Sequence, residues 1–381
     1  MSRVISILGS TGSIGRQTLD VCDKLKIRVA ALTAQASIQR MEEQCRKYRP
    51  QLAVLYKKEA AEELKVRLAD MNITVMSGME GLLAAAQLDG SDTVVTAVSG
   101  MIGLRPTLAA IEKGKKVALA NKESLVVGGE LVMRKALEHH APIVPIDSEH
   151  SAIFQCLIGE ASPLRRLIIT CSGGSLRDLL REALADVTPE QALRHPQWSM
   201  GAKITIDSST LVNKGFEVIE AHWLFGCDAD RISVIQHPQS IVHSMVEFED
   251  GAIKAQLGSP DMHTPISFAL MYPHRAVRHA EPFSFADHPS LTFCEVDREK
   301  YPALDIAYDC MRRGGSAACT MNGANEVAVA AFLNHRCGYL DIVRSIEYAL
   351  SHAVFVAHPA VEEYAACDRE ARALATEALN L

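Results

Sequence analysis

The sequence predicts an α/β protein in three parts: an N-terminal Rossmann-like, doubly wound parallel sheet, a second α/β domain with a mixed sheet, and a C-terminal helical bundle. Through residue 147, short β-branched runs alternate with helix-length segments, and this alternation is typical of a parallel sheet with helices on both faces. Asp250–Gly251 separates two strand-like runs, which indicates an antiparallel hairpin. From Ala303 onward, long segments with helically spaced Ala and Leu dominate, and they predict a small helical domain.

The individual elements follow from short apolar runs and from longer segments with helical periodicity. In the first part we expect strands at 4–8, 28–34, 51–56, 73–76, 93–99, 116–120 and 142–146, and helices at 13–24, 38–48 and 125–139. In the second part we expect strands at 165–171, 202–207 and 231–236 besides the hairpin. The expected domains are 1–147, then 148–272 with a flexible flap at about 194–203, a connector at 273–302 and the helical domain at 303–381.

Length and composition exclude several classes of protein. The chain has 381 residues, a formal net charge of −7 and a sequence pI of about 6.1, so we expect two or three domains and no partnership with nucleic acid or an anionic membrane. The ten cysteines are scattered and contain no CxxC pair, which favours a reduced, cytoplasmic protein over a disulfide scaffold or a zinc ribbon. We also expect neither a signal peptide nor a membrane span, because no apolar run is long enough.

A glycine-rich stretch lies at the first strand-to-helix junction. Gly9, Gly12 and Gly15 follow a predicted strand and open a predicted helix, with the hydroxyls of Thr11 and Ser13 between them. Glycines permit a tight turn, and a helix N-terminus offers N–H groups to the phosphates of a dinucleotide. The alternative is a glycine-rich turn that binds nothing.

The end of the second predicted strand bears on the choice of dinucleotide. NAD enzymes carry an acidic residue there for the ribose 2′-hydroxyl, but residues 33–37 contain no carboxylate. This favours NADP, although Gln35 and Ser37 are weak partners for a phosphate. Arg40 is either a cation for that phosphate or an ordinary solvated helix residue.

Asn121, Lys122 and Glu123 stand where another predicted strand ends and a helix begins. Ligands of parallel sheets bind at the carboxyl ends of the strands, so Lys122 is a candidate to project where a nicotinamide and its substrate meet. Capping of the helix is the alternative role for Asn121 and Glu123.

Asp147 and Glu149 lie two residues apart at the end of a buried strand. Two such carboxylates share a proton, pair with bases or bind a cation; alternatively, they complement the dipole of the next helix. Glu217 is a candidate third oxygen ligand, and together the three favour Mg²⁺ or Mn²⁺ over a thiolate-bound metal. We exclude His150 as a ligand because hard ions prefer oxygen and a histidine just inside a helix usually packs or caps.

Hydroxyls and one lysine predict an anion pocket for a phosphate monoester. Ser172 lies in a glycine-flanked stretch after a predicted strand, Ser208 lies in the segment Asp207–Ser209, and Asn213 and Lys214 begin the helix of Glu217. Each residue taken alone is as well explained as a cap or turn residue. The polar stretch 194–203 contains His195, Trp198 and Met200; it is either a lid over a small ligand or a loop whose Trp packs on its own domain.

These motifs resemble one family, the 1-deoxy-D-xylulose 5-phosphate reductoisomerases. The matching blocks are GSTGSIG, ANKES, PIDSEHSAIFQ, SGGS, HPQWSMGAKITIDSSTLVNKGFEVIEAHWLF, HPQSIVHSMVEF and NGANEVAV, in order from Gly9 to about Val329. The resemblance implies a homodimeric enzyme with an NADPH domain at 1–147 and a catalytic, metal-binding domain at 148–272. It implies rearrangement of the sugar phosphate to an aldehyde and hydride reduction to 2-C-methyl-D-erythritol 4-phosphate, a precursor of isoprenoids.

The resemblance also implies roles for individual residues. The metal ligands would be Asp147, Glu149 and Glu217; the catalytic residues Lys122, Glu149, His195 and His243; the substrate contacts Lys122, Ser148, Glu149, Ser172, His195, Trp198, Met200, Ser208, Asn213, Lys214 and Glu217; and the dinucleotide contacts Thr11, Gly12, Ser13, Ile14, Asn121, Glu123 and Gly201.

Two departures from the family pattern stand out. Gln35, Ala36 and Ser37 replace the usual glycine, basic residue and asparagine that face the 2′-phosphate, and NGANE replaces Asn-Ala-Ala-Asn-Glu. Two other functions remain open at this point: an NADP-dependent dehydrogenase of another branched sugar phosphate, and a non-catalytic dinucleotide sensor. The sequence also leaves open whether the carbon skeleton rearranges by a retro-aldol/aldol path or by a direct 1,2-shift.

Overall fold

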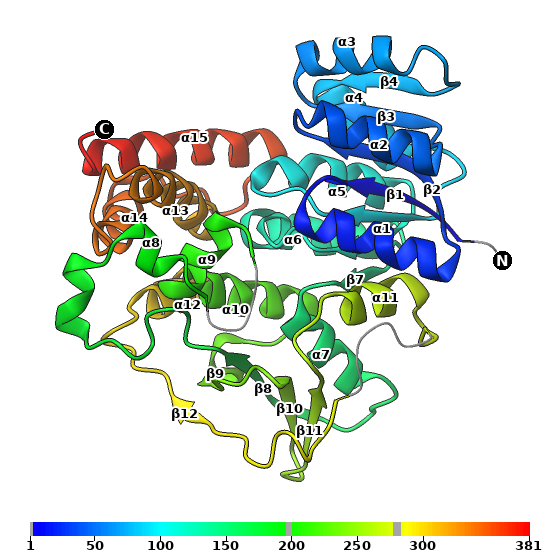
Figure 1. The fold of residues 1–381 in the computed structure, drawn as a ribbon. Coiled ribbons are helices and arrows are strands. Elements are labelled where there is room, and N and C mark those ends of the chain that lie inside the picture. Colours follow the sequence, from blue (N-terminus) through cyan, green and yellow to red (C-terminus); the bar gives the residue numbers. More distant parts are fainter. Residues whose placement is uncertain (1–2, 196–199, 277–282) are drawn as a thin grey trace. The chain divides into compact units, whose positions relative to one another are not determined.

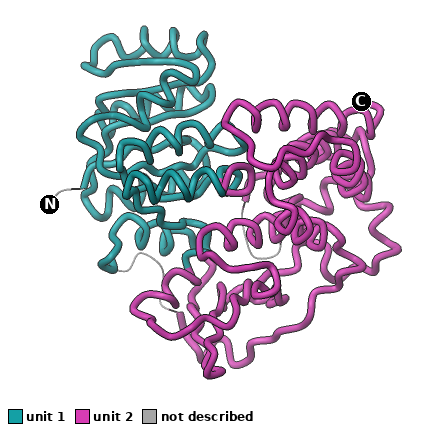
Figure 2. Tube along the Cα trace, turned by 180° about the vertical axis from the view of Figure 1, so that it is seen from behind, with its two compact units in different colours: residues 1–124, 130–151, 261–281 teal, residues 125–129, 152–260, 282–381 magenta. Residues whose placement is uncertain are grey.

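The computed structural model describes residues 3–195, 200–276 and 283–381 (Figure 1). Contacts divide the chain into two compact units, each built from separate segments (Figure 2). The first unit consists of residues 1–124, 130–151 and 261–281, and the second of residues 125–129, 152–260 and 282–381. The segments expected as a catalytic domain and as a helical domain thus contribute most of a single unit, and residues 261–281 return to the first one.

The first unit is built on a seven-stranded sheet in the order β4-β3-β2-β1-β5-β6-β7. Every neighbouring pair is parallel, which confirms the doubly wound sheet predicted from the sequence. Its strands are β1 (Val4–Leu8), β2 (Arg28–Ala34), β3 (Leu52–Leu55), β4 (Thr74–Ser77), β5 (Thr93–Thr96), β6 (Lys116–Leu119) and β7 (Ile143–Pro145). Most of these strands are buried along their length, and they are therefore short continuous apolar runs.

Helices connect the successive parallel strands of this sheet. They are α1 (Ser13–Leu25), α2 (Ile38–Tyr48), α3 (Lys58–Arg67), α4 (Gly78–Gln87), the 3-10 turn η1 (Met101–Gly103) with α5 (Leu104–Glu112), and α6 (Glu123–Glu138). α7 (Ser148–Leu157) starts directly after β7, and α11 (His263–Met271) packs on α1. The strand order reverses between β1 and β5, and ligands of doubly wound sheets bind at such a switch point.

The second unit contains a five-stranded sheet in the order β11-β10-β8-β9-β12. Its strands are β8 (Leu164–Cys171), β9 (Ile232–Gln236), β10 (Val242–Phe248), β11 (Ile253–Leu257) and the short β12 (Cys294–Glu295). β8 and β9 run parallel, whereas the other pairs are antiparallel, so the predicted mixed sheet is confirmed. β10 and β11 form the hairpin expected around Gly251, whose φ of 84° suits only glycine well.

The strand expected at 202–207 is wrong, because this segment is helical. α9 (Ala202–Ser209) is followed by α10 (Val212–Phe225), with Leu211 at a φ of 58° between them. Alternating Ile and Thr predicted a strand, but a helix brings Lys203 and Asp207 onto one face, where they form an ion pair of 2.9 Å. Ser208 therefore lies in the last turn of a helix rather than at a strand end.

Helices form the rest of the second unit and confirm the predicted helical bundle. They are α12 (Ala303–Arg313), α13 (Ala317–Leu333), α14 (Asp341–His352) and α15 (Val361–Ala378), preceded by the short η2 (Arg181–Asp186), α8 (Pro189–Ala192) and η3 (Ala229–Arg231). α13 packs against both α14 and α15. Phe216 of α10 and Phe332 of α13 belong to one apolar core that the sheet and the bundle of this unit share. Among the described residues, no helix is long and apolar enough to cross a membrane.

Candidate active site

The glycine loop after β1 has a backbone that tolerates no side chain at two of its positions. Gly9 has a φ of 92°, and a Cβ there would lie 2.4 Å from the carbonyl oxygen of Ala97; a Cβ on Gly15 would lie 2.2 Å from the carbonyl oxygen of Gly9. The N–H of Gly9 donates to the Thr33 hydroxyl over 3.0 Å. α1 starts directly after Gly12, which brings no side-chain oxygen to cap its N–H groups. The loop is thus shaped for close approach of a phosphate.

Asn121 fixes the junction between β6 and α6. Its side chain is almost fully buried and donates to the carbonyl oxygens of Val98 over 2.9 Å and Gly100 over 3.1 Å, and to a carboxylate oxygen of Glu123 over 2.8 Å. These bonds hold the segment after β5 against the start of α6. Lys122, between Asn121 and Glu123, is thereby held in a defined position.

The first unit brings Lys122, Asp147 and Glu149 together. The Lys122 ammonium lies 3.0 Å from Oδ2 of Asp147, with their side chains 10% and 14% exposed. Carboxylate oxygens of Asp147 and Glu149 lie within 4.8 Å of each other, and Ser148 donates to Glu149 over 2.5 Å. Two acids beside one lysine leave net negative charge at the end of β7, which favours a cation.

His150 contacts Asp147 rather than standing apart from the acids. Its Nδ1 lies 3.0 Å from Oδ1 of Asp147, and its side chain is fully buried. A histidine in this position can orient the carboxylate of Asp147. Because His150 also offers a ring nitrogen to a possible ligand group of the described residues, its exclusion as a metal ligand stays a prediction.

The second unit brings Asn213, Lys214 and Glu217 together on α10. The Asn213 amide donates to Oε1 of Glu217 over 2.5 Å, and the Lys214 ammonium donates to Oε2 over 2.5 Å. The Lys214 and Glu217 side chains are only 5% and 2% exposed. A buried charge needs such partners, since an unpaired carboxylate in an apolar environment is very costly.

Ser172 and His195 meet in the same unit. Ser172 follows β8, its hydroxyl lies 3.1 Å from Nε2 of His195, and it accepts from the N–H of Gly174 over 3.2 Å. Burial, together with the nearby Arg177 guanidinium, lowers the pKa of His195 to about 4. His195 is therefore neutral at pH 7.

Sequence reasoning missed Arg177, although it lies in the same stretch as Ser172. Its guanidinium donates to the carbonyl oxygens of Ser172 over 3.0 Å and Pro238 over 3.3 Å. These bonds tie the glycine-flanked loop after β8 to the segment after β9. A basic residue five positions after Ser172 was the available signal.

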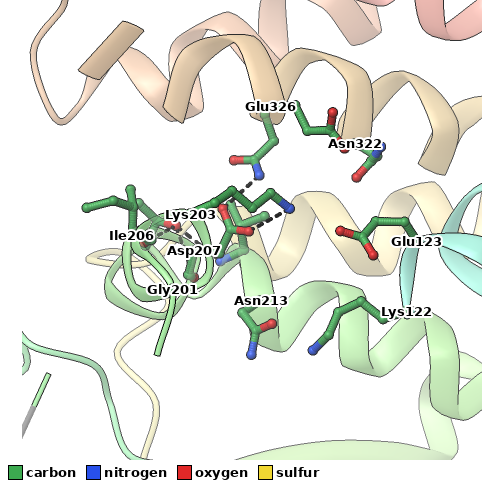
Figure 3. A network of polar contacts seen from close by, with 12 residues as sticks. Lys122, Glu123, Gly201, Lys203, Ile206, Asp207, Asn213, Asn322 and Glu326 are labelled. Carbon is green, nitrogen blue, oxygen red and sulfur yellow. Dashed lines mark hydrogen bonds and ion pairs between the residues drawn. The ribbon is translucent and has the colours of Figure 1, made fainter. Parts of the chain in front are cut away.

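A buried polar network, also missed, anchors the helix of Ser208. Asp207 of α9 is 2% exposed and pairs with Lys203 over 2.9 Å (Figure 3). Asp207 also accepts from the Asn325 amide of α13 over 2.8 Å. The Tyr339 hydroxyl donates to the carbonyl oxygen of Ser209 over 2.6 Å. The NGANE block supplies Asn325, so its role is to hold α9 in place.

The remaining predicted residues are distributed as follows. Met200 is half-buried, Gly201 is the residue before α9, and Trp198 lies outside the described residues. His243 lies in β10, buried, and its carbonyl oxygen accepts from the Thr170 hydroxyl over 2.7 Å. Thr11, Ser13 and Ile14 lie on the glycine loop and the first turn of α1.

Comparison with known proteins assigns the chain to a family. A family model for 1-deoxy-D-xylulose 5-phosphate reductoisomerase matches residues 5–129, and two models for C-terminal domains of the same enzyme match residues 143–225 and 257–374. The chain belongs to the 1-deoxy-D-xylulose 5-phosphate reductoisomerase family. The reductoisomerase of Heliobacterium modesticaldum is 52% identical over 381 residues, which cover 99% of this chain and 97% of the relative. That of Bacteroides thetaiotaomicron is 48% identical and covers 98% and 96%.

Solved reductoisomerase structures share the whole fold. The Zymomonas mobilis enzyme in complex with NADPH has a TM-score of 0.93 at 42% identity, covering 100% of this chain and 99% of its own. A reductoisomerase in complex with NADPH, fosmidomycin and magnesium has a TM-score of 0.94 at 37% identity, covering 100% and 98%.

Proposed function

We propose that this protein is a metal-dependent reductoisomerase that converts 1-deoxy-D-xylulose 5-phosphate and NADPH to 2-C-methyl-D-erythritol 4-phosphate for isoprenoid precursor biosynthesis. The similarity to named reductoisomerases over nearly the whole chain, at 52% identity, carries this conclusion. The side chains that this chemistry needs are present in the two units.

The donor set suits a hard divalent cation. Asp147, Glu149 and Glu217 offer carboxylate oxygens and no thiolate, which is the chemistry that Mg²⁺ and Mn²⁺ prefer. In the proposed enzyme these three residues hold the cation, and His150 keeps Asp147 oriented through its 3.0 Å contact. When bound, the cation supplies Lewis-acid polarisation of the oxygens of the hydroxyketone.

The substrate phosphate is held by Ser172, Ser208, Asn213 and Lys214. Lys214 lies against Glu217, and it stabilises the phosphate by turning one of its three N–H donors towards it. The phosphate is remote from the reacting carbons, so its binding energy serves to orient them. Neutral His195, beside Ser172, offers a hydrogen bond to the substrate without adding charge.

Lys122 acts at the reacting carbons. Its ammonium, held 3.0 Å from Asp147, stabilises the negative charge that develops on a substrate oxygen and can pass a proton to it from Nζ. The glycine loop before α1 holds the pyrophosphate of NADPH, whose hydride reduces the rearranged aldehyde. Ser148 contacts the substrate skeleton, and His243 is a catalytic residue near it. Trp198 and Met200 exclude water from the substrate.

The proposed enzyme is a cytoplasmic homodimer. All ten cysteines are free, and most are buried, which suits a reducing compartment. The dimer follows from the resemblance to the family, and size-exclusion chromatography with light scattering tests it.

The function is tested by following NADPH absorbance with purified protein, Mn²⁺ or Mg²⁺, and 1-deoxy-D-xylulose 5-phosphate. We expect oxidation of NADPH that EDTA stops and that excess Mn²⁺ restores, with 2-C-methyl-D-erythritol 4-phosphate as the product. The matched control is 1-deoxy-D-xylulose without its phosphate, which we expect to react far more slowly. Absence of NADPH oxidation with any divalent cation would refute the proposal, and a reduced but unrearranged product would indicate a plain dehydrogenase.

A further inference from the structure

The end of β2 lacks the residue that would select NADH. NADPH differs from NADH only by the phosphate on the adenosine 2′-oxygen, and NAD enzymes hold the 2′-hydroxyl with a carboxylate after the second strand. Here β2 ends at Ala34, and residues 34–40 contain no acid. Arg40 is the one basic residue among residues 34–40. A positive charge that binds a 2′-phosphate must therefore come from Arg40 or from another segment of the chain.

Arg40 is held against the glycine loop. It lies in the first turn of α2, is exposed, and its Nη1 donates to the carbonyl oxygen of Thr11 over 3.1 Å. α2 is anchored to the same loop by a buried reciprocal pair: the Ser10 hydroxyl donates to the Gln44 side chain over 2.7 Å, and the Gln44 amide donates to the Ser10 carbonyl oxygen over 3.0 Å. This contact uses one of the five N–H donors of a guanidinium, which is planar and matches phosphate geometry.

A second cationic residue, Lys57, lies in the segment after β3 (Leu52–Leu55). The N–H of Lys57 donates to the carbonyl oxygen of Gln35 over 2.9 Å, and that of Tyr56 donates to Ala34 over 2.9 Å. β3 neighbours β2 on the side away from β1, so the backbone of Lys57 lies next to the residues that follow β2. The Lys57 side chain is exposed.

We propose that Arg40 and Lys57 bind the 2′-phosphate of NADPH and set the preference of this chain for NADPH over NADH, with the Ser37 hydroxyl as a neutral partner. This inference rests on the proposed function, because it takes NADPH as the cofactor. Its basis is separate. The Arg40 guanidinium is bonded to the glycine loop, the backbone N–H of Lys57 is bonded to the turn after β2, and residues 35–37 of that turn carry no charge.

The test measures binding rather than turnover. Dissociation constants for NADPH and NADH are obtained without substrate by fluorescence titration for wild type, Arg40→Met and Lys57→Met. We expect Arg40→Met to weaken NADPH binding roughly ten- to a hundred-fold, because a charge-assisted bond to phosphate is lost, while NADH binding changes less than about two-fold. Lys57→Met is expected to have a smaller effect of the same kind, since a lysine offers only a point charge.

Matched controls separate charge at this site from charge elsewhere. Arg49 lies at the other end of α2, and Lys65 lies towards the far end of α3. Arg49→Met and Lys65→Met are both expected to leave the ratio of the NADPH and NADH dissociation constants unchanged. Arg40→Lys is expected to retain most of the preference.

Equal weakening of NADPH and NADH in Arg40→Met would mean that Arg40 only shapes the glycine loop and would overturn the inference, as would an unchanged ratio in both variants. The proposed function fails separately, by absence of turnover in wild-type protein, while the binding ratio remains measurable.

Discussion

Each unit of this protein contains one lysine paired with one carboxylate of the proposed cation site, and the two pairs differ in depth. In the first unit, Lys122 and Asp147 lie 3.0 Å apart with side chains 10% and 14% exposed. In the second, Lys214 and Glu217 lie 2.5 Å apart with side chains 5% and 2% exposed. The first pair joins the ends of two neighbouring parallel strands, whereas the second lies within a single helix.

The difference has an energetic consequence. The Lys122–Asp147 pair is more exposed than the Lys214–Glu217 pair, so solvent reaches the charge that remains after removal of one partner more readily. Lys214 and Glu217 are enclosed by protein, and loss of either one removes an ion-pair partner from a buried charge. We therefore expect a substitution of Asp147 to lower the free energy of unfolding less than a substitution of Glu217.

The largest effect is expected from Glu217→Gln. Loss of a proposed cation ligand should lower kcat/KM roughly a thousand-fold or more, since Lewis-acid stabilisation contributes several kcal/mol. Loss of the charged partner of the buried Lys214 should lower the free energy of unfolding by about 3–5 kcal/mol. Steady-state assays and urea denaturation measure the two effects, and NADPH affinity should stay near the wild-type value.

The double variant Glu217→Gln/Lys214→Met tests the cause of that instability. Removal of both charges should recover much of the lost free energy of unfolding without any recovery of activity. If the double variant is as unstable as the single one, the buried charge is not the cause.

Asp147→Asn should be nearly as damaging to activity but milder in stability. The same ligand chemistry is lost, so kcat/KM should fall by a similar factor. The free energy of unfolding should fall by only about 1–2 kcal/mol, because the pair is partly solvated. A stability loss as large as that of Glu217→Gln would mean that the greater exposure of the Lys122–Asp147 pair does not lower the cost of losing one partner.

The smallest effect concerns His195, which is half-buried beside Ser172. Its folded-state pKa of about 4 lies below the ordinary 6.5, so between these values the unfolded chain binds a proton that the folded protein does not. Stability is therefore lost as pH falls from about 6.5 towards 4. His195→Gln should remove about 1 kcal/mol of the loss between pH 7 and 5, which is less than the full pKa shift would give because solvent reaches the half-buried imidazole. NMR titration of the imidazole checks the pKa directly; a midpoint near 6.5 would contradict the expected desolvation.

Much of the fold could be predicted because its signals are local. The alternation of strand and helix, the Asp-Gly turn of the hairpin and the glycines before α1 depend on neighbouring residues only. The segment 202–207 shows where this fails: its Ile-Thr alternation suits a strand, yet contacts with α13, including the bond from Asn325 to Asp207, accompany a helix. Long-range packing overrides a weak local preference.

The sequence by itself determined the parallel and mixed sheets and the family, because the sheets follow from local periodicity and the family from long contiguous blocks of residues. Tertiary structure alone decided which residues share an environment. It set Arg177 beside Ser172 and His195, Lys57 against Gln35, and Asn325 on Asp207 across 118 positions of the chain. It also decided the depth of each lysine–carboxylate pair, since burial depends on the whole unit around a side chain and not on its neighbours in sequence.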